Sequence, residues 1–227
     1  MMLFTDSEII RSWHVNAAPW TKAIEREEIE SRKLITNQAI INVILEEPPL
    51  ELLDLGCGEG WLARELASKG INVFGIDAVP ELIEKCKQRG DANFVVCTYE
   101  NLSLLKLDKK FDSIVCNFSL IGKESSELAV HFSLNQLKAN GRLIIQTLHP
   151  LIACGDLAYM DGWRPGSWSG FSEDFKEPAP WYFRTIEGWC RLFERSKFRL
   201  LSIYEPLHPR TQKPASIIFE CVPEADL

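Results

Sequence analysis

Apolar positions along the chain follow two different spacings, and their alternation predicts a repeated strand–helix order. Five short apolar runs have the length of buried strands, and between them are stretches where apolar residues recur about every 3.6 positions. The runs are ELLDLG (51–56), INVFGID (71–77), NFVVCT (93–98), FDSIVCNFSL (111–120) and RLIIQTL (142–148). Buried strands joined by helices are typical of a parallel sheet in a doubly wound α/β domain.

Three helix boundaries follow from capping and helix-breaking residues. Residues 21–46 show a helical apolar repeat, which Thr21 is expected to begin and Pro48 to end. The helix after the fourth apolar run is expected to close at Gly141, because glycine commonly terminates helices.

The regular spacing of apolar residues ends after the fifth run. Residues 150–183 hold eight aromatic side chains, interrupted by four glycines and four prolines, without a helical or strand period. We expect a long functional insertion without regular elements, ordered because aromatic residues argue against disorder. One helix and two strands are predicted after it, from TIEGWCRLFERS (185–196), FRLLSIYEP (198–206) and ASIIFECVP (215–223).

Composition narrows the class of protein. Of 227 residues, 46% are hydrophobic and 25% charged, which suits one large domain with a sizeable core. The net charge of −7 argues against a nucleic-acid surface, which usually needs a basic footprint. No apolar run approaches the ~18 residues of a membrane span, and no secretory signal is evident. Seven widely spaced cysteines without a CxxC pair predict buried, reduced thiols in a cytoplasmic protein.

The stretch LDLGCGEGW carries the first candidate chemistry. Gly56, Gly58 and Gly60 follow a predicted strand and precede a predicted helix, an arrangement that binds nucleotides at a sheet edge. A P-loop is excluded because no lysine follows, and a dinucleotide fingerprint would need glycine where Trp61 stands. At the end of the next strand, Asp77 either accepts two ribose hydroxyls or caps the following helix.

Together these motifs resemble the class I S-adenosylmethionine-dependent methyltransferases, in the small-molecule branch of types 11 and 12. LDLGCGEG resembles the first motif, GIDAVPELIEKC the second, and FDSIVCNFSL and LKANGRLIIQTLHP the fourth- and fifth-strand motifs. The resemblance implies a seven-stranded sheet in the order 3-2-1-4-5-7-6, with the last strand antiparallel and helices on both faces. It implies a single domain made of an amino-terminal helical lid (1–47), a cofactor core (50–149), a substrate-covering insertion (150–184) and a carboxyl-terminal helix and strands (185–227).

The resemblance also implies the cofactor S-adenosyl-L-methionine and the product S-adenosyl-L-homocysteine. The glycine-rich turn over residues 56–60, called the elbow below, lets main chain approach the methionine and ribose. Asp54 orients the amino group, and Asp77 binds the ribose. Thr98 and Tyr99 stand where family members often carry an acid that contacts adenine. The expected cofactor-binding residues are Trp20, Arg32, Asp54, Gly56, Cys57, Gly58, Asp77, Ala78, Thr98, Tyr99, Asn117 and Phe118.

Three of these positions also have a simple structural interpretation. Arg32 either grips the methionine carboxylate with its planar fork or pairs with Glu28 one turn earlier. Phe118 either lines the sulfonium region or belongs to the core. Trp20 either shields the site from water or packs in the ordinary way.

Methyl transfer from an activated sulfonium depends mainly on positioning and on exclusion of water. A hydroxyl or ammonium acceptor also needs a base, and His149, after the fifth strand, is the best-placed candidate. Its alternative is packing against Pro150, and His208 is a weaker second choice. Tyr182 is the other catalytic candidate. Residues expected to shape the acceptor pocket are Tyr159, Trp181, Tyr182 and Arg184.

The function that we expect is S-adenosylmethionine-dependent methylation of O, N or C in a small molecule, in the cytoplasm. The stretch NFSL lacks the [DNS]PP[YFW] motif that is common in enzymes that methylate DNA bases and amides. Neither a nucleic acid nor a membrane is expected as a partner. Two other classes stay open: a cofactor-binding protein of the same fold without turnover, and an NAD-dependent oxidoreductase.

Overall fold

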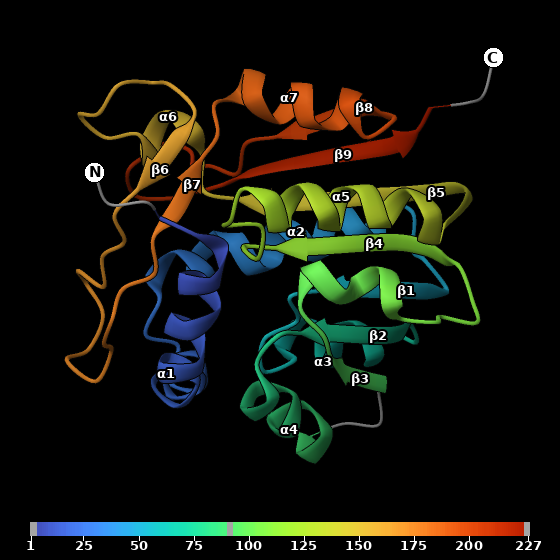
Figure 1. Cartoon of the computed structure of the whole chain (residues 1–227), viewed down its shortest axis with the longest axis horizontal. Helices are drawn as coiled ribbons and strands as arrows, with labels where there is room; N and C mark the ends of the chain where they lie inside the picture. The colour runs from blue at the N-terminus through green and yellow to red at the C-terminus, as the bar shows by residue number, and fades with distance from the viewer. Residues whose placement is uncertain (1–3, 90–92, 225–227) are drawn as a thin grey trace.

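A seven-stranded sheet forms the centre of the molecule (Figure 1), in a computed structural model that describes residues 4–89 and 93–224. The order is β3-β2-β1-β4-β5-β9-β8, with β9 antiparallel to both neighbours and the other pairs parallel. The expected order and the antiparallel last strand are therefore confirmed. The strands are β1 Glu51–Leu55, β2 Asn72–Asp77, β3 Asn93–Val96, β4 Phe111–Asn117, β5 Leu137–Thr147, β8 Phe198–Tyr204 and β9 Ile217–Pro223.

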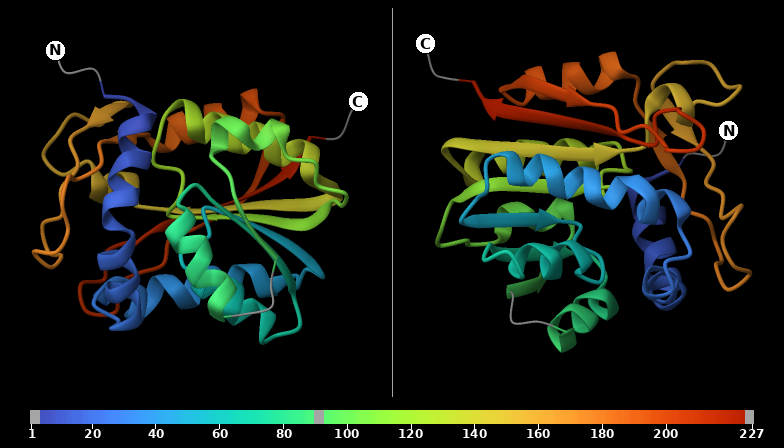
Figure 2. Two further views of the ribbon diagram at one scale, coloured as in Figure 1. Left: turned by 60° about the horizontal axis from the view of Figure 1, so that its bottom comes forward. Right: turned by 180° about the vertical axis from the view of Figure 1, so that it is seen from behind.

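Helices cover both faces of the sheet, as the two views in Figure 2 show. One face packs against α2, α3 and α4, and the other packs against α5, α7 and a 3-10 segment, η2. Side chains of a strand alternate between faces. Leu52 therefore packs on the face covered by α2, α3 and α4, whereas Leu53 and Leu55 pack on the face covered by α5 and α7. The helices are α2 Asn37–Glu46, α3 Trp61–Ala67, α4 Pro80–Arg89, η2 Tyr99–Leu104, α5 Glu124–Gln136 and α7 Ile186–Arg195.

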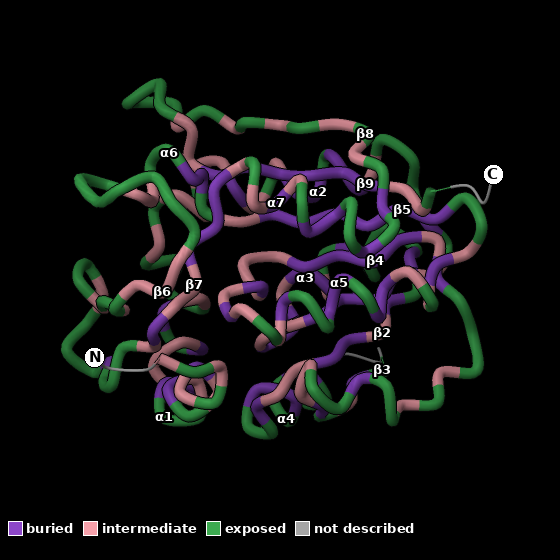
Figure 3. Tube along the Cα trace, turned by 45° about the horizontal axis from the view of Figure 1, so that its top comes forward, coloured by how far each residue is buried: buried purple, intermediate pink, exposed green. Residues whose placement is uncertain are grey.

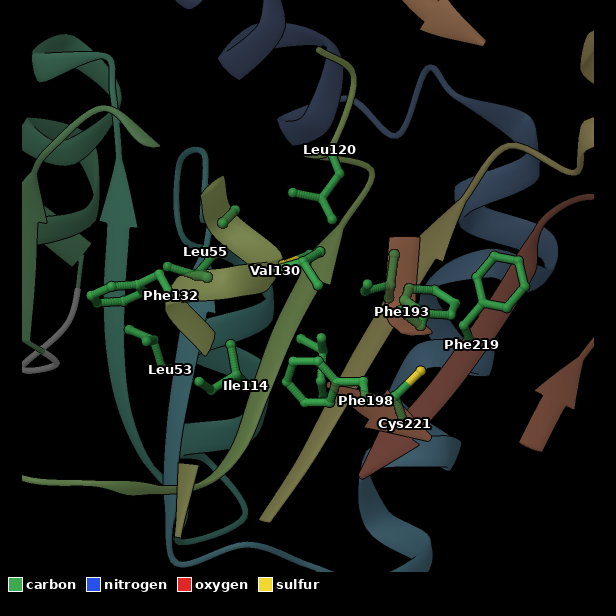
Figure 4. Close-up of a cluster of buried hydrophobic side chains, with 14 of the residues drawn as sticks. Leu53, Leu55, Ile114, Leu120, Val130, Phe132, Phe193, Phe198, Phe219 and Cys221 are labelled. Atoms are coloured by element: carbon green, nitrogen blue, oxygen red, sulfur yellow. The ribbon is translucent and has the colours of Figure 1, made fainter. Parts of the chain in front are cut away.

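The larger core cluster lies between the sheet and helices α5 and α7 (Figure 4). Leu53 and Ile114 come from neighbouring strands, Val130 from α5 and Phe193 from α7, and all four are fully buried. Figure 3 shows the same distribution along the chain, with burial concentrated in the strands and exposure in the connecting loops. This packing fixes the positions of the strand ends, where the functional side chains are carried.

The amino-terminal region differs from the single predicted helix over 21–46. Helix α1 (Asp6–Glu25) begins much earlier and contains Pro19, and a π-helical turn, η1 (Arg32–Thr36), precedes α2. Thr21 therefore lies inside a helix, where its hydroxyl donates to the Ala17 carbonyl at 2.9 Å. The apolar period missed α1 because its buried face includes Ser12, Asn16 and Thr21.

The expected helix closure at Gly141 is also wrong. Helix α5 ends at Gln136 and β5 begins at the next residue, so Gly141 lies within a strand. The pairing of β4 with β5 shifts register beside it, between Phe111 and Ser113. A Cβ at Gly141 would lie 3.1 Å from the Asp112 carbonyl oxygen, so glycine here serves close approach of strands.

The insertion contains more regular structure than expected. It begins with a short helix, α6 (Pro150–Ala153), and β6 (Gly162–Arg164) pairs antiparallel with β7 (Trp181–Phe183). The predicted helix that follows is confirmed as α7, where the Thr185 side chain accepts the Gly188 N–H at 2.9 Å as an N-cap. In the described residues, no helix is long and apolar enough to cross a membrane.

Candidate active site

A cavity of about 360 Å³ opens at the carboxyl ends of the parallel strands. Gly56 follows β1, Asp77 ends β2, Asn117 ends β4 and Thr147 ends β5, and all four line this cavity. Helix α1 and the insertion close its other side and lie beside the strand ends in Figure 1. This edge of an open α/β sheet is where ligands generally bind.

The glycine elbow has three residues in the left-handed region, with φ of +77° at Gly56, +57° at Gly58 and +80° at Gly60. A Cβ at Gly56 would overlap the Ser119 side chain, whereas a Cβ at Gly58 would meet only Trp20 Nε1, at 3.8 Å. Gly60 caps α3 and is not part of the cavity wall. All three positions favour glycine because of their positive φ, and of the two that line the cavity only Gly58 has room for a Cβ.

Asp77 connects the elbow to the second strand. Its Oδ2 accepts the Gly58 N–H and its Oδ1 accepts the Val79 N–H, both at 2.9 Å. Burial raises the pKa of the Asp77 carboxyl, and these main-chain donors oppose that rise. The bond from the Val79 N–H agrees with the interpretation of Asp77 as a helix cap. Each carboxylate oxygen of Asp77 still has a second lone pair for a ligand.

Arg32 reaches the same cavity from η1 and lies between two indole rings. Its guanidinium carbon is 5.5 Å from the centroid of Trp20 and 4.9 Å from that of Trp61. Burial lowers its pKa. Its NH2 atom is buried without a partner among the described residues, and the ion pairs found there do not join it to Glu28. The arginine thus presents an unused donor at the cavity.

Comparison with known proteins bears on this edge of the sheet. Residues 52–141 match the family described as "Methyltransferase domain". A relative named "Ubiquinone biosynthesis O-methyltransferase" from Rickettsia canadensis is 31% identical over 140 residues, covering 59% of each chain. The Rickettsia felis protein of the same name is 31% identical over 140 residues, covering 59% of this chain and 57% of that one. The chain thus spans less than two thirds of the length of these relatives.

Solved structures share the fold. The Burkholderia thailandensis 1,6-didemethyltoxoflavin-N1-methyltransferase has a TM-score of 0.67 at 16% identity, covering 99% of this chain and 93% of that one. An S-adenosylmethionine-dependent methyltransferase from Clostridium acetobutylicum has a TM-score of 0.66 at 16% identity, covering 92% and 98%. The chain therefore has the fold of the S-adenosylmethionine-dependent methyltransferases, and its residues 52–141 match a methyltransferase domain. The narrower assignment to types 11 and 12 stays a prediction.

The methyltransferase cofactor carries a carboxylate, an ammonium, a sulfonium, a ribose and an adenine, and the site can be tested against these groups. Buried polar atoms without a partner in the described residues concentrate at the carboxyl edge of the sheet, where such a ligand would lie. Donors and acceptors are both present, so a zwitterionic tail and hydroxyls fit the set. These atoms are Arg32 NH2, Asp54 Oδ1, Glu59 Oε1, Tyr99 OH and Asn117 Oδ1.

Two of these atoms belong to carboxyl groups buried behind the elbow. Asp54 and Glu59 are each 1% exposed, and neither side chain lines the cavity. Glu59 lies 3.6 Å from Arg64, whereas burial, with the nearby Asp77 carboxylate, raises the pKa of Asp54 to about 8. The elbow is thus backed by buried acidic groups, and burial favours the protonated form of Asp54 in the free protein.

Helix α1 and the insertion form one cover over the cavity. The Asn16 side chain binds the Lys176 main chain twice, donating to its carbonyl at 2.7 Å and accepting its N–H at 2.9 Å. The Ser12 hydroxyl donates to the Glu177 carbonyl at 2.5 Å. Because Asn16 is fully buried, these bonds are shielded from water and join segments about 160 positions apart.

The cover gives the cavity an aromatic wall. Trp13 packs edge-to-face on Trp20 and Trp168, with centroids 5.1 and 5.9 Å apart. Buried Arg184 lies over Tyr182 and Trp189, 4.8 and 5.2 Å from their centroids. The aromatic residues of the cavity wall are Trp13, Trp20, Tyr99, Phe118, Trp168, Phe171, Trp181, Tyr182, Phe183 and Trp189.

Most of the predicted site residues meet at this cavity. The residue after β4, Phe118, has a φ of +54°, a strained conformation for a bulky side chain, and lines the cavity beside Asn117. The predicted residues that line the cavity are Trp20, Arg32, Gly56, Gly58, Asp77, Ala78, Tyr99, Asn117, Phe118 and Tyr182. Of the residues expected to shape the acceptor pocket, Trp181 and Arg184 also line it.

The remaining predicted residues lie away from the cavity wall. The Cys57 side chain packs in the core with α3, and Thr98 occupies the N-cap position of η2 without a side-chain capping bond. Buried His149 has its Nε2 2.6 Å from Glu205 Oε1, and neither it nor His208 lines the cavity. The structure therefore does not bring the expected base to the acceptor side, because β5 ends with that ring facing the loop after β8.

Sequence reasoning missed the inner face of α1, which contributes Asp6, Ile9 and Ile10 to the cavity. The signal that could have found this helix is the capping box of Thr5 and Glu8. It also missed buried Glu59, because an acid between two glycines resembles an ordinary turn residue.

Proposed function

We propose that this chain transfers the methyl group of S-adenosylmethionine to a nucleophilic O, N or C atom of a small molecule. The observation that carries the proposal is that Arg32, Tyr99 and Asn117 line the cavity with buried polar atoms that have no partner among the described residues, beside an aromatic compartment in the same cavity. One part of the cavity suits a charged nucleoside, and the other suits a flat apolar acceptor.

Bound S-adenosylmethionine would supply an electrophilic methyl carbon on a sulfonium. In our proposal, Arg32 NH2 binds the carboxylate of the methionine tail, and Asp77 uses its free lone pairs for the ribose hydroxyls. Gly58 lets the tail lie against main chain. Tyr99 and Asn117 offer their unpartnered oxygens to the adenine and sulfonium side.

The acceptor would lie under the cover, against Tyr182 and its aromatic neighbours. Holding the nucleophile in line with the methyl group and excluding water supply most of the acceleration that such a site can give. The curated relatives are named as O-methyltransferases and one solved neighbour as an N1-methyltransferase, so both kinds of nucleophile stay within the proposal. The seven free cysteines, five of them buried, support a cytoplasmic location.

Isothermal titration of S-adenosylmethionine, S-adenosylhomocysteine and NAD tests the proposal. We expect both adenosyl compounds to bind and NAD not to bind. Asp77→Ala should weaken the adenosyl compounds about 10- to 100-fold, because hydrogen bonds to a charged group contribute about 1.5–3 kcal/mol each. Asp112→Ala is a matched control, since its carboxylate accepts the Leu50 and Glu51 N–H groups at the opposite edge of the sheet.

Failure of both adenosyl compounds to bind the wild type would overturn the proposed function. Equal affinity of the wild type and Asp77→Ala for these compounds would overturn the role of Asp77 in binding the ribose. Turnover is measured with labelled methyl donor and a metabolite extract, followed by mass spectrometry of the labelled product. Binding without any labelled product would instead favour the alternative of a cofactor-binding protein.

A further inference from the structure

The charged residues of the cavity wall are unevenly distributed. Asp77 ends β2, Glu100 follows β3 and Arg32 lies beside the elbow, so these three serve the nucleoside side. Asp6 and Arg184 lie on the cover side, next to the start of α5. Among the residues that line the cavity, Asp6 is the one carboxylate contributed by the cover.

Asp6 is held by two main-chain N–H groups at the start of α5. Its Oδ1 accepts the Lys123 N–H at 3.0 Å, and its Oδ2 accepts the Ser125 N–H at 2.5 Å. Lys123 is the N-cap residue of α5 and Ser125 lies in its first turn, and the positive end of a helix favours a negative charge. Each carboxylate oxygen has a second lone pair, so two acceptor positions are still free after these bonds are made.

Arg184 offers little to a ligand by comparison. Its NH1 donates to the Gly122 carbonyl at 2.9 Å and its NH2 to the Lys123 carbonyl at 2.8 Å. Its faces lie against Tyr182 and Trp189. The guanidinium is therefore engaged by protein groups on its terminal nitrogens and on its planar surface.

Much of the remaining wall around Asp6 is apolar, with Ile9, Ile10, Leu120 and Ile121 among the aromatic rings. We propose that the Asp6 carboxylate receives a hydrogen bond from an O–H or N–H group of a neutral, flat acceptor and so orients it. The inference rests on the proposed function and specifies the acceptor class. An anionic acceptor would meet a fixed carboxylate, and a cationic one would meet the sulfonium.

The experiment compares matched aromatic probes on protein saturated with S-adenosylhomocysteine. The pairs are phenol and anisole, catechol and 1,2-dimethoxybenzene, and indole and 1-methylindole, and ligand-observed NMR gives each affinity. We expect the member that carries the O–H or N–H to bind the wild type about tenfold more tightly, because a charge-assisted hydrogen bond is then formed. Asp6→Asn should reduce this preference below about twofold, because an amide is a weaker acceptor than a carboxylate.

Ser125→Pro separates recognition from a structural latch, because it removes one donor to Asp6 and keeps the carboxylate; proline is tolerated in a first helical turn. Retention of the preference in Ser125→Pro with its loss in Asp6→Asn supports the proposal. Absence of a preference in the wild type overturns it, as does an undiminished preference in Asp6→Asn. Equal loss of both probes in the two variants shows a latch alone and also overturns it. Failure of S-adenosylhomocysteine to bind the wild type is different, since that result contradicts the proposed function itself.

Discussion

The two sides of the cavity are held by different kinds of contact. On the elbow side, the N–H groups of Gly56 and Cys57 donate to the Ile76 carbonyl at 2.7 and 3.0 Å, which continues the pairing of β1 with β2. On the cover side, α1 meets the insertion through a few side-chain bonds such as those of Asn16 and Ser12. The elbow side is thus held by main-chain bonds that continue the sheet, whereas the cover side is held by side-chain bonds between separate segments.

This difference indicates how the site works. Segments with few buried contacts open at lower free energy than core strands do. We therefore expect the elbow side to be formed before any ligand arrives, and the cover side to open for exchange and to close over the acceptor. Substitutions at the elbow should then change cofactor affinity, whereas substitutions in the cover should change access and turnover.

The largest effect should come from Gly56→Ala. The new Cβ overlaps Ser119 at a residue with φ of +77°, so the elbow must shift, and cofactor affinity should fall about a hundredfold or more. Gly70→Ala is the matched control, because Gly70 has φ of +82° with open space around it. It should lose about 1 kcal/mol of stability and bind normally. Titration calorimetry decides, and equal affinities in the two variants would remove the elbow from the site.

Arg32→Lys should weaken S-adenosylmethionine about tenfold, because lysine keeps the charge and loses the planar fork between the two indoles. Arg26→Lys is the control at an exposed position of the same region. If both variants bind the cofactor as the wild type does, Arg32 is a packing residue.

Asp54 predicts a pH dependence of stability in the free protein. Its pKa is raised to about 8, above the ~3.9 of an unfolded chain, so the folded state holds a proton that the unfolded chain releases. Its contribution to stability is therefore complete below about pH 4 and is lost as the pH rises through about 8. The Tm of Asp54→Asn should fall less steeply than that of the wild type between about pH 5 and 8.5.

Asp112→Asn is the control for that measurement. Its carboxyl has a lowered pKa, for which hydrogen bonds from Lys138 and the Glu51 main chain outweigh desolvation, so its contribution to stability is lost as the pH falls. The variant should therefore change the acid limb of the Tm curve and leave the upper limb unchanged. Superimposable curves for wild type and Asp54→Asn would contradict the raised pKa of Asp54.

The smallest and most local effect should come from Asn16→Ala. It leaves the Lys176 N–H and carbonyl without their buried partner, which costs about 1–3 kcal/mol in the closed cover. Hydrogen exchange around residues 172–178 should accelerate while cofactor affinity stays unchanged. Lys22→Ala breaks only an exposed pair with Asp174 and should change exchange by less than about fivefold. Weaker cofactor binding in Asn16→Ala would show that the two sides are not independent.

How far the sequence could anticipate the molecule follows the same division. The sheet order and the elbow depend on local patterns, namely apolar runs and glycine spacing, and on their resemblance to a known family, so residues such as Gly58 and Asp77 could be predicted. The cover depends on contacts between distant segments. Asn16 lies in a mixed polar helix, and nothing local indicates that it pairs with Lys176.

His149 illustrates the same limit at the level of one side chain. Its position at the carboxyl end of β5 was predictable from the apolar pattern. The direction of its ring depends on Glu205, which arrives from the loop after β8, 56 residues later. A sequence pattern places a residue at an edge of the sheet, whereas the partner across the fold decides which way its side chain turns.

The position of β9 has a consequence for biosynthesis. This strand follows β8 in the chain yet lies between β5 and β8, pairing Ile145 with Phe219 on one side and Ile203 with Phe219 on the other. During translation β8 therefore emerges before the one strand that can join it to the sheet. The ribosome must release residues 217–223 before this edge can close, and a nascent chain that pauses earlier exposes an unpaired strand to chaperones.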